Sequence, residues 1–395
     1  MKFHRKFDRM ATMASLVIAV ALPGMPAVAQ QQGVSKNEIV IGSIQDLSGP
    51  IAAFGKQARA GMQLRVDEVN EQGGVHGRKL RLLVEDSAYD PKRAVLAAQK
   101  LVNQDKIFIM AGHVGTAHNN AAMPVQFDKN IINFLPISPS TSMFEPLNKL
   151  KYSFAVTYDD QIRASLPKLV KEKSAKRVCI LYQDDEFGLE VLKGAETAVK
   201  DLNMALIEKT SYKRGSTDFS TQVAKMKASN CDLVVLATII RETIGAIGES
   251  RKSGFNPTFL SVNTAYSELI HKLGGPAMNG LYSSMTVQHP YLDETSQPVR
   301  FWANKYKTKF NDDPGTLSVY GYQIIDMFVQ AAQKAGPNLT TDSLIKTLDN
   351  SRFPSDIFGA PEVAFTSQIR IGSRASRLSQ IQDGRWKVLS DYVKP

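Results

Sequence analysis

Cysteine is scarce in this chain, with only two residues of that type, Cys179 and Cys231, among 395. So few cysteines exclude a small fold held together by several disulfides. Both residues stand at the start of apolar, strand-like runs, VCILY and CDLVVLA. Neighbouring parallel strands can bring such residues close, but their sulfur atoms often point apart. We therefore expect two buried thiols, with a disulfide as the less favoured alternative.

Histidine is also sparse, and its six residues show no spacing typical of a metal site. His113 and His118 lie five residues apart in a stretch that reads as a strand-to-helix loop. That separation places the two rings off a common face, and no carboxylate completes a ligand set. We expect no bound metal and no cofactor.

Motifs of catalysis and nucleotide binding are missing as well. The chain has no Gly-x-Ser-x-Gly, no phosphate loop, and no Gly-x-Gly-x-x-Gly after its first strand. The acidic pairs Asp159-Asp160 and Asp184-Asp185 are adjacent carboxylates, which do not face each other across a substrate. These absences predict a protein that is not an enzyme.

Long hydrophobic runs are limited to one, Met10 to Leu22, behind a basic start. Pro23-Gly24 ends the run, and Ala27-Val28-Ala29 provides a small-x-small cleavage triplet. This layout predicts a secretory signal peptide that is cleaved after Ala29. A single membrane anchor is the alternative, but it needs a longer apolar core. No cysteine follows the run to carry a lipid, so we expect a soluble, exported chain.

The formal net charge of +10 is spread along the chain. The densest basic segment, residues 168–177, falls where a helix ends and a strand begins. Cations suit the C-terminus of a helix, so the segment predicts a solvated helix end and no nucleic-acid surface.

From Glu38 onward, short β-branched runs alternate with amphipathic stretches, which predicts βα units and parallel sheets. Asp90-Pro91 marks one helix start, with Asp90 as the N-cap. A first strand series runs through IVIGSI, LRLLVED, IFIMAG and IINFLP, and a second through RVCILY, LVVLAT, TFLSV and GLYSSM. The helices are expected at 52–71, 91–104, 117–128, 187–202, 219–229 and 242–253.

Three further helices are expected only after the second strand series, at 297–310, 315–335 and 341–348, followed by short antiparallel strands. Their late position predicts an α/β protein with two doubly wound lobes that the chain crosses more than once. A cleft then lies between the lobes, and ligands bind beyond the carboxyl ends of the strands.

Several segments resemble the periplasmic solute-binding proteins of branched-chain amino-acid-type ABC importers. These are IVIGSIQDLSGPIAAFGKQARAGMQLRVDEVNEQGGVHGRKL, YDPKRAVLAAQKLV, AGHVGT, YQDDEFG and GLYSS, in the family's order along the mature chain. The resemblance implies a type I periplasmic binding fold, with three crossover segments between lobes that close on a ligand. It implies lobe one over 30–156 and 287–376, and lobe two over 157–286 and 377–395, behind the signal peptide 1–29.

The same resemblance implies a periplasmic, monomeric receptor that delivers a small carboxylate, an amino acid or an aromatic acid, to membrane ABC permease subunits. A periplasmic ligand sensor for a membrane signalling receptor is the alternative.

Family ligand contacts transfer to this chain only where the motifs align. In lobe one they fall on Phe54, Thr116, Ile137 and Ser138; in lobe two they fall on Phe187, Ile239 and Asn263. Pro139 stands where the family offers another donor, and a shifted alignment uses Ser140 and Thr141 instead. The structural alternatives are core positions for Phe54 and Phe187, a helix cap for Thr116, and a turn residue for Asn263.

Asn263 is the informative departure, because amino-acid-binding members carry an acidic residue at that position. An amide supplies no charge to offset the desolvation of an ammonium group. The pocket is therefore expected to suit a carboxylate on an apolar or aromatic body. If the ligand has an ammonium group after all, Glu242 is the next candidate to pair with it.

Overall fold

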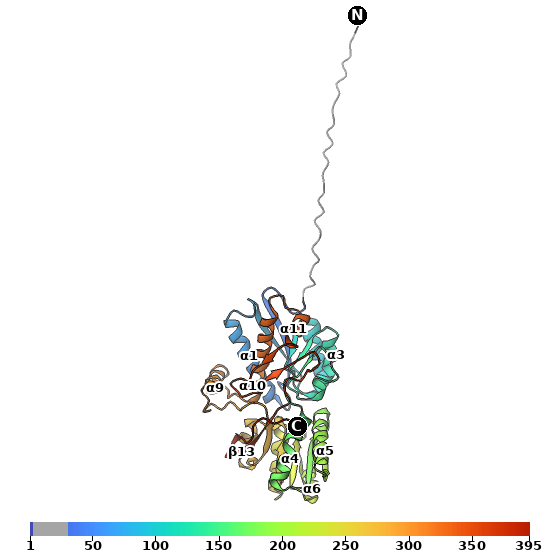
Figure 1. The fold of residues 1–395 in the computed structure, drawn as a ribbon, viewed down its shortest axis with the longest axis vertical. Helices are drawn as coiled ribbons and strands as arrows, with labels where there is room; N and C mark the ends of the chain where they lie inside the picture. Colours follow the sequence, from blue (N-terminus) through green and yellow to red (C-terminus); the bar gives the residue numbers. More distant parts are fainter. Residues whose placement is uncertain (3–30) are drawn as a thin grey trace. The chain divides into compact units, whose positions relative to one another are not determined.

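The computed structural model describes residues 1–2 and 31–395. The apolar run and cleavage site of the predicted signal peptide fall on residues 3–30 and lie outside the described residues. Between 31 and 395, strands and helices alternate and build two mainly parallel sheets (Figure 1).

The first sheet contains five parallel strands in the order β2-β1-β3-β4-β5. The strands are β1 (Glu38–Gln45), β2 (Lys79–Asp86), β3 (Ile109–Ala111), β4 (Ile132–Phe134) and β5 (Lys151–Tyr152). Its helices are α1 (Ala52–Glu71), α2 (Pro91–Gln99) with a π-helical turn (Lys100–Gln104), α3 (Thr116–Phe127), α10 (Thr316–Ala335) and α11 (Thr341–Leu348). We call this sheet and its helices lobe one.

The second sheet has the order β14-β13-β10-β9-β8-β6-β7, in which β13 runs antiparallel to both neighbours, β10 and β14, and the other pairs are parallel. The strands are β6 (Val178–Gln183), β7 (Glu208–Tyr212), β8 (Leu233–Ala237), β9 (Thr258–Ser261), β10 (Tyr282–Met285), β13 (Arg377–Gln382) and β14 (Arg385–Val388). Its helices are α4 (Tyr158–Lys173), α5 (Glu186–Asp201), α6 (Ser220–Ala228), α7 (Ile240–Lys252) and α8 (Glu268–Gly274). We call this sheet and its helices lobe two.

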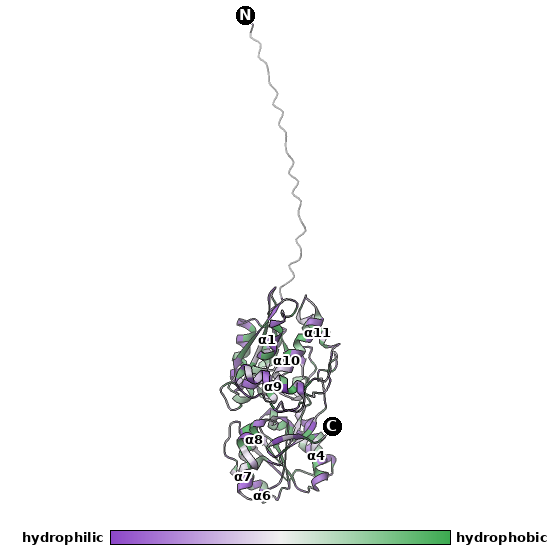
Figure 2. Cartoon of the chain, turned by 90° about the vertical axis from the view of Figure 1, so that its left-hand side faces the viewer, coloured by the Kyte–Doolittle hydropathy of each residue, from purple (hydrophilic) through white to green (hydrophobic). Residues whose placement is uncertain are grey.

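The central strands are buried on both faces because helices cover both sides of each sheet. Every residue of β8 is buried, as are all but the first residue of β1. Hydrophilic stretches instead mark outer helices such as α4 and α7 (Figure 2). This contrast separates the core strands from the solvated layer.

The chain crosses between the lobes three times, as predicted. It passes from β5 to α4, returns after β10 to α9 (Gln297–Phe310) and α10, and leaves again after the short pair β11 (Arg352–Phe353) and β12 (Val363–Ala364) to reach β13. The lobe boundaries implied by the resemblance, at 156/157, 286/287 and 376/377, stay predictions.

Local signals placed the predicted helix ends within two residues, when the π-helical turn is counted with α2, but α4 and α8 were not among the predicted helices. The Asp90 carboxylate accepts bonds from the N–H groups of Lys92 (2.7 Å) and Arg93 (3.4 Å), which confirms the N-cap. Helices α1, α9 and α11 have the predicted bounds. Strand β7, which the strand series above do not include, begins at Glu208, where its pairing with β6 starts opposite Cys179.

The expectation of two free thiols is wrong: Cys179 and Cys231 form a disulfide, with their Cα atoms 5.9 Å apart. The sequence argument placed both residues in strands, yet β8 begins only at Leu233. Cys179 lies opposite Val234 in the sheet, and Cys231 precedes the strand. Its side chain is therefore free of the alternation that fixes strand side chains, and it turns toward Cys179.

Candidate functional site

A cavity of about 50 Å³ lies between the two lobes, and we call it the cleft. Its walls come from the loops after β1, β2, β3, β4, β8 and β9, together with the first turns of α1 and α4 and with α10. This is the carboxyl edge of both sheets, where open α/β sheets place their ligands. The lining residues are Ile51, Phe54, Tyr89, Val114, Gly115, Ile137, Pro139, Tyr158, Ile239, Asn263, Thr264, Leu317 and Tyr320.

Helix α3 begins at the lobe-one wall of the cleft. Its N-cap, Gly115, has φ +91°, and a Cβ there would collide with the His118 ring. Thr116 is the first helical residue, and its Oγ1 lies 2.9 Å from the Oγ of Ser138. The N–H groups of this first turn have no acceptor within the helix and carry its positive end. The wall is therefore suited to an anion such as a carboxylate.

The imidazoles beside this wall are neutral near pH 7. Burial lowers the pKa of His118 to about 4 and holds the pKa of His113 well below its usual range. The His118 ring stacks on Tyr89 with centroids 4.4 Å apart. An anion at this wall is therefore bound by N–H and O–H donors and not by a histidine cation.

The middle of the cleft is aromatic and apolar. Phe54, Tyr89, Tyr158 and Tyr320 line it, with Ile137 and Ile239 on opposite lobes. Phe187 lies behind this wall, buried, with its ring packed edge-on against Tyr158 at 4.8 Å. Tyr158 therefore stands between Phe187 and the cleft.

The lobe-two wall offers amides and hydroxyls. The Asn263 backbone N–H donates to Gln161 Oε1 (2.8 Å), and the Asn263 Oδ1 accepts from Gln161 Nε2 (3.2 Å). Thr264 Oγ1 donates to the carbonyl of Thr238 (2.7 Å). No Asp or Glu is among the described residues that line the cleft. Glu242 is 3% exposed, its pKa is raised by burial, and it does not line the cleft.

Of the seven predicted site residues, the structure brings Phe54, Ile137, Ile239 and Asn263 into the lining. Thr116 and Ser138 lie directly behind Gly115 and Ile137 and contact each other. Ser140 and Thr141, the shifted alternative, build the start of a short 3-10 turn, and Pro139 lines the cleft in their place.

Sequence reasoning missed three tyrosines of the lining. Tyr89 follows β2 directly, so the rule that ligands bind beyond strand ends was sufficient to nominate it. Tyr158 stands one residue after Thr157, which caps α4. Tyr320 lies inside α10 and carries no local signal.

Two properties of the described residues concern membrane-spanning helices and metal binding. Among residues 1–2 and 31–395, the helices are all too short or too polar to cross a bilayer. The same residues contain no group of three or more His, Cys, Asp or Glu side chains arranged to hold a metal ion.

Two α/β lobes, three crossovers and a cleft at the carboxyl edges of both sheets define a two-lobed binding protein of the type I periplasmic class. The chain belongs to the periplasmic binding protein family, whose signature matches residues 38–385. This membership confirms the predicted resemblance to periplasmic solute-binding proteins.

Relatives of known name support this placement. The leucine-, isoleucine-, valine-, threonine-, and alanine-binding protein of Pseudomonas aeruginosa is 22% identical over 82% of this chain and 84% of its own length. A fatty acid ABC transporter substrate-binding protein from Thermomonospora curvata has a TM-score of 0.85 at 23% identity, covering 93% and 95% of the two chains. A branched chain amino acid ABC transporter structure from Thermus thermophilus, with bound valine, has a TM-score of 0.83 at 16% identity, covering 92% and 98%.

Proposed function

We propose that this protein is the periplasmic substrate-binding component of an ABC importer, released by cleavage after Ala29 and acting as a monomer that delivers its ligand to membrane permease subunits. The family membership and the two-lobed cleft support this role. The names of the three relatives agree with it, since amino acids and fatty acids are small molecules that carry a carboxylate.

We further propose that the ligand is a carboxylate on an apolar or aromatic body, without an ammonium group. The observation that carries this is the charge pattern of the cleft. One end has the N-terminus of α3 with Thr116 and Ser138 behind it, and no described lining residue is acidic. An ammonium group would lose its hydration without gaining an anionic partner.

Capture proceeds in two steps in this proposal. The carboxylate first binds to the α3 wall of lobe one, and lobe two then closes with Ile239 and Asn263 over the ligand body. Closure is driven only by contacts that the ligand makes better in the closed form. Lobe-two residues should therefore govern closure more than first capture.

The test is a thermal-shift screen of the mature protein followed by calorimetry. Phenylacetate, benzoate and isovalerate are compared with phenylalanine and leucine, which carry the same side-chain types with an ammonium group. A ligand present at 100 times its Kd should add about 2.7 kcal/mol to the free energy of unfolding. Tight leucine binding would overturn the proposed ligand class while leaving the transport role intact. Turnover of any bound compound would overturn the transport role.

A further inference from the structure

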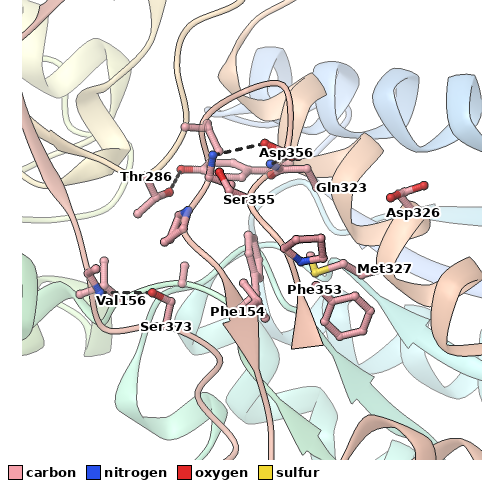
Figure 3. A pocket seen from close by; sticks show the side chains of 18 of the residues that line it. Phe154, Val156, Thr286, Gln323, Asp326, Met327, Phe353, Ser355, Asp356 and Ser373 are labelled. Carbon is pink, nitrogen blue, oxygen red and sulfur yellow. Dashed lines mark hydrogen bonds between the residues drawn. The ribbon is translucent and has the colours of Figure 1, made fainter. Parts of the chain in front are cut away.

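A second, larger cavity of about 140 Å³ lies where the chain crosses between the lobes, and we call it the hinge cavity (Figure 3). All three crossovers contribute to its wall. Phe154 to Val156 come from the first, Thr286 and Val287 from the second, and Ser373 and Ala375 from the third. The face of α10 and the segment 353–363 complete it.

The inner wall of the hinge cavity is apolar. Phe154, Val156, Val287, Phe353 and Val363 are all buried. The volume of the hinge cavity is close to that of a cavity that accepts one benzene-sized molecule, about 150 Å³. A single aromatic ring is therefore the body that this wall fits.

The charged groups of the hinge cavity are both carboxylates, Asp326 and Asp356, beside neutral amides and hydroxyls. Asp356 accepts bonds from the N–H groups of Phe358 (2.9 Å) and Ala360 (3.2 Å) and from the Gln323 side chain. Asp326 pairs with Arg65 at 2.8 Å. Two carboxylates line the hinge cavity, and no Lys, Arg or His is among its described lining residues. This charge pattern disfavours anions, in contrast to the α3 wall of the cleft.

One side chain forms part of both cavities. Tyr320 lines the cleft and the hinge cavity. Its ring packs edge-on against Phe154 at 5.6 Å, and its hydroxyl lies 2.7 Å from Thr286 Oγ1. Tyr320 therefore joins helix α10 of lobe one to two of the three crossovers.

We propose that the hinge cavity is a second binding site, for a single-ring aromatic molecule that carries a neutral or positively charged hydrogen-bond donor. The ring packs against Phe154 and Phe353, and the donor points to Asp356. Because three crossovers form the wall, a rotation between the lobes changes the shape of the cavity. A bound molecule therefore favours the lobe arrangement in which the cavity fits it.

The experiment measures binding of benzylamine, phenol and benzoate to the mature protein by ligand-observed NMR and calorimetry. Benzylamine and phenol are expected to bind at the hinge cavity. Benzoate, whose carboxylate suits the α3 wall, is expected to bind there or not at all. Ala360→Phe places a ring at the half-buried mouth and should weaken benzylamine and phenol about tenfold or more, without changing benzoate.

Ala277→Phe, at a half-buried alanine outside both cavities, is the matched control and should change none of the three affinities. Asp356→Asn keeps the side-chain size and removes the charge, so it should weaken benzylamine more than phenol. Circular dichroism verifies that each variant is folded.

Three results would overturn the proposal. They are no binding of benzylamine or phenol to the unmodified protein, unchanged affinities in folded Ala360→Phe, and benzoate binding that Ala360→Phe abolishes. None of them bears on the cleft, so the transport role is judged separately by the ligand screen.

Discussion

The Glu190 carboxylate, on helix α5 of lobe two, accepts two bonds from Thr141 of lobe one. The Thr141 N–H and its hydroxyl both lie 2.8 Å from Glu190 Oε1. A third bond across the lobes joins Gln57 Nε2 of α1 to Glu268 Oε1 of α8 at 2.8 Å. These three bonds join lobe one to lobe two directly.

Removing the Glu190 contact should shift the protein toward an open form. Glu190→Ala deletes both bonds to Thr141, and charge-assisted bonds of this kind contribute about 1.5–3 kcal/mol when buried. Because Glu190 is only partly buried, we expect the lower end, near a tenfold loss of affinity for the cleft ligand.

The measurement is calorimetry with small-angle scattering to follow closure. Glu196→Ala is the control, because Glu196 lies on the same helix in an exposed pair with Lys209. It should leave the ligand affinity and the extent of closure unchanged. Equal affinities for Glu190→Ala and the unmodified protein would show that this contact does not hold the closed form.

The free energy of unfolding should also depend on pH through the same residue. Burial raises the pKa of Glu190, although the bonds from Thr141 act in the opposite direction. The sign follows from linkage: a group whose pKa is raised by folding contributes stability that is fully present below the ordinary glutamate pKa and is lost as pH rises through the raised value. This contribution to stability should therefore grow on acidification from pH 7. Glu190→Gln should flatten the part of the pH profile that is due to this group, and an identical profile in denaturant unfolding would contradict the assignment.

The disulfide should stabilise lobe two without affecting the cleft. It closes a loop across a sequence separation of 52 residues, from Cys179 in β6 to Cys231 before β8. Loss of such a crosslink costs about 2–4 kcal/mol, because the crosslink restricts the conformations open to the unfolded chain. The double variant Cys179→Ala/Cys231→Ala should unfold at lower denaturant concentration and bind its ligand unchanged. Thiol titration of the unfolded, non-reduced protein should find no free thiol.

The fold was predictable because its signals are local. Asp90-Pro91 marked a helix start that the structure confirms, and the alternation of β-branched runs with amphipathic stretches indicated two parallel sheets. The disulfide was not predictable from the sequence, because the direction of the Cys231 side chain depends on where β8 begins. That boundary is set by pairing with β6, a contact between distant residues.

The cleft was predictable in part for the same reason. Phe54, Ile137, Ile239 and Asn263 follow strands or begin helices, so topology alone placed them at the carboxyl edges. Tyr320 sits inside α10, a helix far along the chain that returns to pack on α1. The late position of this helix predicted a return to lobe one, but no pattern around Tyr320 marked it as a cleft residue. Phe187 follows a strand as well, but Tyr158 covers it, and the order of two aromatic rings is a matter of packing.

Thr116 offers a direct test of the anion wall. Thr116→Val keeps the shape but removes the hydroxyl that contacts Ser138, and it should weaken carboxylate binding by about 1–3 kcal/mol. Thr116→Ser retains the hydroxyl and should bind within a few-fold of the unmodified protein. Calorimetry on both variants measures the contact with the carboxylate. Thermal unfolding measures any loss of stability, so the binding role of Thr116 is separated from a structural one. Unchanged affinity in Thr116→Val would indicate that the carboxylate binds elsewhere and not at the N-terminus of α3.

Asn263 offers a test of the proposed ligand class, because its surroundings make a conservative substitution possible. Asn263→Asp preserves the side-chain size, the bond from the backbone N–H to Gln161, and the oxygen that accepts from Gln161 Nε2. The fold should therefore be kept, while the cleft gains a carboxylate.

If the natural ligand lacks an ammonium group, Asn263→Asp should weaken the binding of phenylacetate and similar carboxylates by about 1–3 kcal/mol, because the two carboxylates repel each other. It should strengthen the binding of the corresponding amino acid by a similar amount. Asn263→Gln, which remains neutral, is the control and should not improve amino-acid binding. Calorimetry with phenylacetate and phenylalanine measures both directions in one pair of ligands. If Asn263→Asp binds phenylacetate more weakly without binding phenylalanine more tightly, Asn263 contacts the ligand but does not select against an ammonium group. In that outcome the missing acidic residue is not the source of specificity, and the apolar wall of Phe54, Tyr158 and Ile239 must select the ligand by shape.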